Sequence, residues 1–144
     1  MEDDIATSKA TNLEPLSKEE CLALLATASV GRVAVALPGG PPLVLPVNYA
    51  LDGEVIVFRS DPGSKLDALR EHPASFQVDG IDPFHRTGWS VLVQGFAYET
   101  SPAEVEVEPW DGGPKAHWVR IYAGGITGRR LTLPQVELDP RGYL

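Results

Sequence analysis

At 144 residues the chain has the length of one domain, and its 43% hydrophobic and 22% charged residues are typical of a globular protein. Its formal net charge of −8 at pH 7 argues against a nucleic-acid partner, because binding a duplex depends on many Lys and Arg side chains. No apolar run approaches the ~18 residues of a membrane helix, and the acidic start Met1–Asp4 lacks the features of a secretory signal, so we expect a cytoplasmic protein that binds no membrane.

The N-terminal part is expected to contain an arm and one helix. Residues 1–15 are polar, show no periodicity and end at a proline, so we interpret them as a flexible arm before a single domain at residues 16–144. Residues 17–20 have the pattern of a capping box. The apolar run at residues 21–26 then predicts a short amphipathic helix.

Three strands are predicted next. Residues 31–37 alternate β-branched with small residues, and a loop rich in Pro and Gly separates them from a second strand at 43–50. A hairpin signal at residues 51–53 leads into a third strand at 54–59. Pro46 within the second strand indicates an edge, a bulge or a bend.

The next segment is expected to be a short helix, followed by two longer strands. The helix begins after Gly63 and ends near His72, and a strand pattern resumes at residues 74–79. A loop at 80–88 separates this strand from the longest one, at 89–98, in which Gly95 indicates a bulge, an edge or a barrel bend.

The C-terminal part is predicted to hold a brief helix and a hairpin. Residues 101–104 form a second capping-box pattern, and residues 110–114 read as a turn. Residues 117–122 and 126–133 are predicted to form a final hairpin. Short strands at even spacing indicate an antiparallel barrel or sandwich. A barrel of about six strands fills its own interior, so a ligand would bind outside it or between subunits.

Four polar residues gather around the loop between the third strand and the following helix. They are Arg59, Ser60, Ser64 and Lys65. Two cations, two hydroxyls and the free N–H groups of a helix start are what a phosphate needs, so this segment is a candidate phosphate cradle. The alternative is an ordinary strand-to-helix turn in which Ser64 is the N-cap. Neither a P-loop nor a Gly-x-Gly-x-x-Gly motif is present.

Other reactive residues offer little. The single cysteine, Cys21, excludes an internal disulfide and a thiolate metal site, and a small buried side chain is its simpler interpretation. The histidines are far apart without a helical i, i+4 pairing, so we expect no metal site. No Gly-x-Ser-x-Gly elbow supports hydrolysis.

The order of these motifs resembles the pyridoxamine 5′-phosphate oxidase-like flavoproteins, the FMN-binding split-barrel group. The resemblance covers roughly Leu16 to Thr100 and rests on residues 31–35, 46–49, 57–65 and 88–95. It implies a mainly β fold, a six-stranded antiparallel split barrel with short flanking helices. It also implies a homodimer with two FMN sites at the subunit interface.

The resemblance further implies three groups of cofactor-binding residues. The ribityl phosphate would be held by Arg59, Ser60, Ser64 and Lys65. The isoalloxazine ring would be lined by Pro46, Val47 and Asn48. The side of the cofactor would be touched by Trp89 and Ser90. Asn48 as a hairpin residue and Trp89 as barrel core remain alternatives.

Two departures from the oxidase itself stand out. Only Lys65 follows Ser64, where the oxidase has a paired Arg-Lys, and the C-terminal Trp and Arg that hold pyridoxal phosphate find no counterpart in the tail Gly128-Arg129-Arg130. Vitamin B6 synthesis is therefore not expected. The tail either reaches a cofactor or substrate anion from the partner subunit or is a solvated strand end. It looks closer to small paralogues, some of which use a deazaflavin.

We therefore expect a homodimeric FMN-binding oxidoreductase that acts on an unidentified small organic molecule. The flavin would carry the redox chemistry, and no side chain is an obvious catalytic acid or base, so the catalytic residues are unknown. The alternatives are a deazaflavin-dependent reductase, a flavin- or haem-binding protein or sensor without turnover, and an empty barrel. Trp110, Trp118 and residues 126–131 are available to cover the ring.

Overall fold

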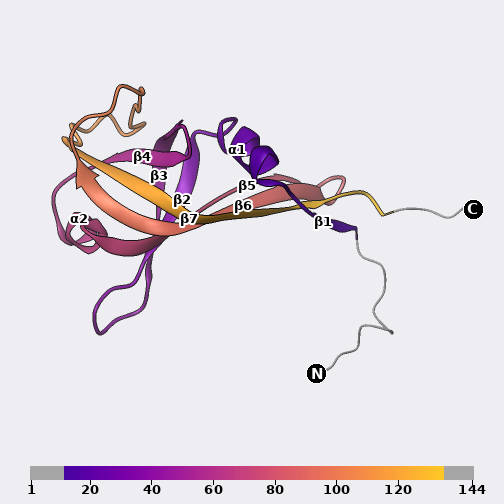
Figure 1. The fold of residues 1–144 in the computed structure, drawn as a ribbon, viewed down its shortest axis with the longest axis horizontal. Helices are drawn as coiled ribbons and strands as arrows, with labels where there is room; N and C mark the ends of the chain where they lie inside the picture. The colour runs from indigo at the N-terminus through magenta and orange to yellow at the C-terminus, as the bar shows by residue number, and fades with distance from the viewer. Residues whose placement is uncertain (1–11, 135–144) are drawn as a thin grey trace, which may run out of the picture.

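The computed structural model describes residues 12–134, and the elements in this part of the chain are strands with two short helices (Figure 1). In chain order they are β1 (Leu13–Pro15), α1 (Lys18–Leu25), β2 (Val30–Val35), β3 (Leu43–Asp52), β4 (Val55–Ser60), α2 (Ser64–Leu69), β5 (His72–Asp82), β6 (Thr87–Thr100) and β7 (His117–Leu131). Neither helix is long and apolar enough to cross a membrane.

Strands β2 to β7 form a closed six-stranded antiparallel barrel, which confirms the predicted fold. The hydrogen-bonded order is β7-β4-β3-β2-β5-β6, and a pairing between β6 and β7 closes the ring. Strand β1 adds to the free side of β7 at its C-terminal end, with Leu13 opposite Leu131. Residues 13–15 are therefore strand, although we expected them in the flexible arm. Residues 1–11 of that arm lie outside the described part.

The predicted final hairpin is wrong, because β7 is one strand of 15 residues. Ala123 lies opposite Gly95, whereas Gly125 lies opposite Gln94, so Gly124 is an extra residue in the ladder. A bulge of this kind bends a strand without ending it. Two consecutive glycines look like a turn in the sequence, yet here they let the strand bulge and continue. Of the three alternatives for Gly95, the structure shows the bulge, as a register shift between Gln94 and Gly95.

The brief helix predicted after Ser101 is also wrong, because residues 101–116 contain no helix. The guanidinium of Arg120 donates hydrogen bonds to the Thr100 hydroxyl and the Ser101 carbonyl, which competes with a helix start. The predicted turn at residues 110–114 is present, and Gly112 N donates to Pro109 O at 3.2 Å. The loop expected at 80–88 shrinks to a turn at 83–86.

The helix starts differ from each other. At α1 the predicted capping box is confirmed, because Glu20 N donates to the Ser17 hydroxyl and Ser17 N donates to the Glu20 carboxylate. At α2 the N-cap is Gly63, with φ of 141°, and no side chain caps the helix. The N-cap role considered for Ser64 is therefore wrong. The helix ends at Leu69, before the position expected from the sequence.

The interior of the barrel is filled by its own side chains. Phe58, Phe76 and Ile56 are fully buried, and the rings of Tyr49 and Phe76 meet edge to face with centroids 4.8 Å apart. Helix α1 packs against β6 and β7, and α2 packs against β5 and β6. A ligand of any size must therefore bind at the outside of the barrel. On the outside of the barrel, residues 101–116 lie toward one end of the long axis and β1 lies toward the other (Figure 1).

Candidate functional site

A cavity of about 450 Å³ lies between strand β3 and the segment 107–115, which we call the wall segment. Cavities of this size are typical of small-molecule sites. It is lined by Val30, Leu45, Pro46, Val47, Asn48, Arg59, Lys65, Pro109, Trp110, Asp111 and Lys115. Five of the nine predicted site residues therefore meet at one cavity.

Strand β3 supplies the apolar side of this cavity. Residues 43–48 pair with β2, whereas pairing with β4 begins only at Tyr49. Before Tyr49, residues 43–48 of β3 therefore have no strand on their second side among the described residues. The proline in this half of the strand, Pro46, fits such an edge because it donates no ladder hydrogen bond. The edge expected from Pro46 is thus present, and it faces the cavity.

Arg59 comes from β4, and its guanidinium is bound to the wall segment. Its Nε donates to the Lys115 carbonyl at 3.0 Å, Nη1 to the Val107 carbonyl at 3.2 Å and Nη2 to the Pro114 carbonyl at 2.9 Å. The guanidinium carbon also lies 5.1 Å from the ring centroid of Trp118, within cation–π range. Arg59 therefore lines the cavity while most of its donors are engaged by backbone.

Two further contacts fix the wall segment. The ammonium of Lys115 lies 3.0 Å from carboxylate oxygens of both Asp61 and Asp111. These hydrogen bonds lower the pKa of both carboxyls and raise the pKa of Lys115. In addition, the side-chain oxygen of Asn48 accepts a hydrogen bond from Trp110 N at 2.8 Å. Asn48 therefore contacts the wall segment, which a residue that serves only the hairpin would not do.

Lys65 is the cation of the cavity that remains available. Its side chain is half-buried at the start of α2, and it forms no ion pair with any residue from 12 to 134. Arg59 and Lys115 are both engaged by protein groups, so among residues 12–134 Lys65 is the positive group of the cavity without an ion-pair partner.

The two serines of the predicted cradle do not line this cavity. Ser60 is fully buried and its hydroxyl donates to the Asp61 carbonyl at 2.8 Å. Ser64 is exposed and lines a different hollow together with Leu37, Pro38 and His72. Ser64 and Lys65 are the first two residues of α2, and successive side chains of a helix point about 100° apart around its axis.

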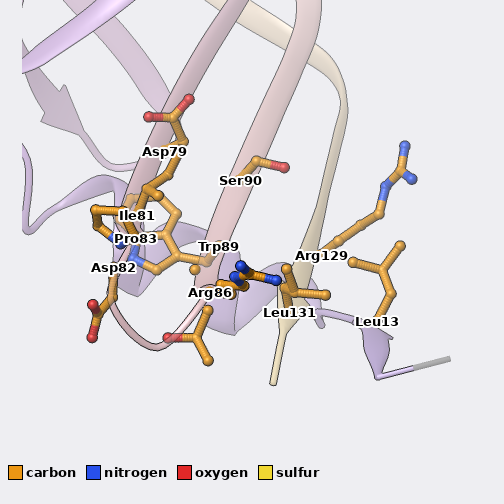
Figure 2. A pocket seen from close by; sticks show the side chains of 12 residues that line it. Leu13, Asp79, Ile81, Asp82, Pro83, Arg86, Trp89, Ser90, Arg129 and Leu131 are labelled. Carbon is orange, nitrogen blue, oxygen red and sulfur yellow. The ribbon is translucent and has the colours of Figure 1, made fainter. Parts of the chain in front are cut away.

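A second hollow, which we call the groove, lies beside the turn between β5 and β6 (Figure 2). Its volume is about 360 Å³, and its lining includes Trp89, Ser90, Arg129, Ile81 and Leu131. The indole of Trp89 packs over Gly80, where a Cβ atom would come within 2.6 Å of its nitrogen. Trp89 is half-buried and packs against the barrel core from its edge, so it is not a fully buried core residue.

The two hollows share no residue, so one chain does not unite all the predicted site residues. Arg129, from the tail singled out in the sequence, lies with Trp89 and Ser90 in the groove. Sequence analysis missed Lys115 and its two aspartates, because no local pattern signals a contact between residues 54 positions apart. Among residues 12–134 no group of three His, Cys, Asp or Glu side chains is placed to hold a metal ion.

Comparison with known proteins connects this fold to one family. A family model described as pyridoxamine 5′-phosphate oxidase matches residues 17–130. An uncharacterized protein of Mycobacterium tuberculosis, Rv0080, is 35% identical over 135 residues, which cover 85% of this chain and 88% of that protein.

Two solved structures are similar over nearly their whole length. A putative pyridoxamine 5′-phosphate oxidase from Corynebacterium glutamicum has a TM-score of 0.72 at 30% identity and covers 84% of this chain and 99% of its own. An FAD-binding protein from Mycobacterium smegmatis has a TM-score of 0.69 at 29% identity and covers 83% and 99%. From its sequence and its fold, the chain belongs to the pyridoxamine 5′-phosphate oxidase-like family.

Proposed function

We propose that this protein is a flavin-dependent oxidoreductase that binds FMN in the cavity between β3 and the wall segment. The observation that carries the proposal is the accessible ammonium of Lys65 at one side of a cavity whose other side is the apolar edge of β3. A flavin nucleotide has these two characters, a planar ring with large apolar faces and a phosphate dianion.

The residues of the cavity fit such a ligand in part. Lys65 is placed to hold the phosphate, and Pro46 and Val47 offer a surface for the ring. Ser60 and Ser64 do not open into the cavity, so the proposed phosphate contacts are fewer than the four that the sequence indicated. When bound, the flavin supplies hydride or electron transfer. The protein supplies charge at the phosphate and a partly water-excluded face for the ring.

The choice of flavin is part of the proposal. The similar Mycobacterium smegmatis structure is that of an FAD-binding protein. FAD also carries an anionic phosphate next to its ribityl chain, so Lys65 would serve both cofactors equally well. We favour FMN because the cavity of about 450 Å³ is lined on the described residues by one cationic group without a partner. A deazaflavin with a longer anionic tail would require further free cations.

A homodimer would complete the site. The groove holds Trp89, Ser90 and Arg129, and the apolar side chains beside it are largely exposed, with Phe84 at 87% and Ile81 at 72%. Exposed apolar groups of this size are typical of a surface that contacts another protein. We infer that the groove of one subunit meets the cavity of its partner, so that Trp89 and Ser90 approach the flavin from the second chain.

Ligand titration tests the cofactor assignment. Replacing Lys65 with Ala should weaken FMN binding by about 1.5–3 kcal/mol, the range for a hydrogen bond to a charged group. This loss corresponds to roughly 10- to 150-fold in Kd. Riboflavin lacks the phosphate, so its affinity should stay the same. Lys18→Ala is the matched control, because Lys18 lies on α1 and pairs with Glu54 outside the cavity.

The same titration separates the alternatives. If FAD or a deazaflavin binds more tightly than FMN, that molecule is the cofactor instead of FMN. If the Lys65→Ala variant binds FMN as tightly as the wild type, the assignment of Lys65 to the phosphate is refuted. Turnover is tested by mixing the FMN-loaded protein anaerobically with NADH, NADPH or reduced deazaflavin and then adding quinone or nitroaromatic acceptors. Repeated bleaching and recovery would support an oxidoreductase. A flavin that only dithionite reduces would indicate a binding protein without turnover.

A further inference from the structure

Among the side chains that hold the wall segment to the barrel, Arg59 makes three hydrogen bonds to its backbone. Three of the five N–H groups of Arg59 donate to backbone carbonyls of residues 107, 114 and 115, and one face of its guanidinium lies on Trp118. These carbonyls lie at both ends of the segment. Arg59 therefore closes the segment into a loop against β4, and the Val107 side chain, 5% exposed, fixes its first residue.

This arrangement leaves Arg59 poorly suited to hold a phosphate. A side-on fork to an anion uses Nε–H together with one terminal N–H, and here Nε–H is donated to the Lys115 carbonyl at 3.0 Å. To bind the phosphate in this way, Arg59 would have to release the wall. Lys65 has no such commitment among the described residues.

The wall segment presents an aromatic side chain at the cavity. Trp110 lines the cavity, and 75% of its surface is exposed. Its backbone is fixed because Trp110 N donates to the Asn48 side chain, which belongs to the opposite, β3 side. Large aromatic side chains gain much of their stabilisation by burying their faces, so a planar ligand between Trp110 and β3 would cover an otherwise wet indole.

Charge indicates which part of the ligand lies under the wall. The wall segment carries Glu108 and Asp111 against one cation, Lys115, whose ammonium is paired with Asp61 and Asp111, and of these acidic groups Asp111 lines the cavity. This acidic segment repels a phosphate and accepts an uncharged ring. The phosphate end therefore belongs to the Lys65 side, and the ring belongs beside Trp110.

We infer that Arg59 is a positioning residue that holds the wall segment, and that Trp110 on this segment is the residue that selects a planar ring by stacking on it. The inference rests on the proposed flavin site but assigns roles within it that differ from a phosphate cradle containing Arg59. Lys65 and Arg59 line the same cavity and carry the same charge, yet they act on different parts of the ligand.

Comparing Arg59→Ala with Lys65→Ala tests the role of Arg59 in two ways. In Arg59→Ala, FMN and riboflavin should lose affinity by the same factor, about tenfold, because the wall serves the ring. Amide hydrogen exchange at residues 110–115 should accelerate about tenfold in the ligand-free protein. In Lys65→Ala the loss should be confined to FMN, and the exchange of these amides should stay unchanged.

A selective loss of FMN in Arg59→Ala, with unchanged exchange at 110–115, would overturn the positioning role and make Arg59 a phosphate ligand. A wild-type protein that binds no flavin would overturn the proposed function and the role of Trp110 together. The hydrogen-exchange comparison needs no flavin, so it would still decide whether Arg59 holds the wall.

Trp110 is tested by two substitutions. Trp110→Ala should weaken FMN and riboflavin binding about tenfold, while Trp110→Phe, which keeps an aromatic face, should recover most of that loss. Hydrogen exchange at the other wall amides should remain as in the wild type in Trp110→Phe. Equal affinities in the wild type and Trp110→Ala would overturn stacking on this residue.

Discussion

Residues 101–116, which include the cavity wall, and the turn between β5 and β6 beside the groove lie toward opposite ends of the long axis (Figure 1), and different forces hold the cavity and the groove. The cavity wall has no regular structure and is fixed by the side chains of Arg59, Asn48 and Asp61. The groove is built from continuous strands, whose backbone ladders run through Trp89 and Ser90. A single polar substitution should therefore loosen the cavity, whereas only a change in packing should disturb the groove.

The largest effect is expected at Gly95, which stands at the register shift between β6 and β7. A Cβ atom at Gly95 would lie 2.0 Å from the Tyr122 carbonyl oxygen, which is backbone and has little freedom to move. We expect Gly95→Ala to destabilise the fold by about 3 kcal/mol and to disturb both regions, because the bulge at this point sets the course of β6 and β7. Urea unfolding followed by fluorescence measures the loss.

Gly125→Ala is the matched control for this substitution. Gly125 lies opposite Gln94 in the same ladder, but a Cβ atom there meets nothing within 4 Å. We expect the control to unfold within about 1 kcal/mol of the wild type. Equal unfolding midpoints for both variants would show that the close approach at Gly95 is relieved without cost.

The second-largest effect is expected on the proposed dimer, when substitutions are placed beside the groove and the cavity is left unchanged. Ile81→Asp combined with Phe84→Asp places two charges on the exposed side chains beside the groove. We expect the dimer to dissociate at least tenfold more readily, because burying an unpaired charge opposes association. Sedimentation should then show a monomer of 15.5 kDa at micromolar concentration.

Val44→Asp is the control for association. Val44 is also an exposed apolar residue, at 57%, and it lies on β3 outside both hollows. It should leave the dimer intact. If the double variant sediments like the wild type, the groove is not the dimer surface, and the contribution of Trp89 from a second chain has to be abandoned.

The smallest effect is the acid sensitivity of the cavity end. Hydrogen bonds from Lys115 lower the pKa values of Asp61 and Asp111 below 3.8, so both carboxyls bind protons less readily in the folded protein than in the unfolded chain. The two carboxylates therefore contribute fully to stability when the pH is above the pKa of an aspartate in the unfolded chain, and this contribution is lost as the pH falls through their lowered pKa values in the folded protein. Hydrogen exchange at residues 110–115, corrected for the intrinsic rate, should accelerate below about pH 4.

Two comparisons check this pH dependence. Amides paired between β5 and β6 should show no matching acceleration in the same pH range. A variant with both Asp61→Asn and Asp111→Asn should exchange faster at residues 110–115 already at neutral pH, with little further change in acid. Acceleration of both regions together would point to general unfolding instead of loss of the Lys115 ion pairs.

Much of the barrel could be predicted, because its strands alternate apolar and polar residues and turn residues separate them. The errors fell where distant contacts decide the local conformation. The Gly124-Gly125 pair is typical of a turn, yet the pairing with β6 continues on both sides of it, so the chain forms a bulge within one strand. Residues 101–104 read as a helix start, yet Arg120 donates to the Ser101 carbonyl, which would accept the first hydrogen bond of such a helix.

The candidate site was predictable to a similar extent. The family resemblance put Pro46 and Lys65 in one site, and in the structure both residues line one cavity. The sequence could not show which of the two neighbouring residues Ser64 and Lys65 faces the cavity, because that depends on how α2 is rotated about its axis against the barrel. Nor could it show that Arg59 binds carbonyls 48 to 56 residues further along the chain.

The long strand β7 also has a consequence for how the protein reaches its fold. It pairs with β4 along its first part and with β6 along most of its length, so both strands keep open edges until it docks. At the end of β7, Leu131 also pairs with Leu13 of β1, near the other end of the described chain. Pairings this distant in sequence slow folding, and open edges invite pairing between chains. During synthesis the barrel therefore stays open until its last strand has emerged, and misassembly is most probable in that interval.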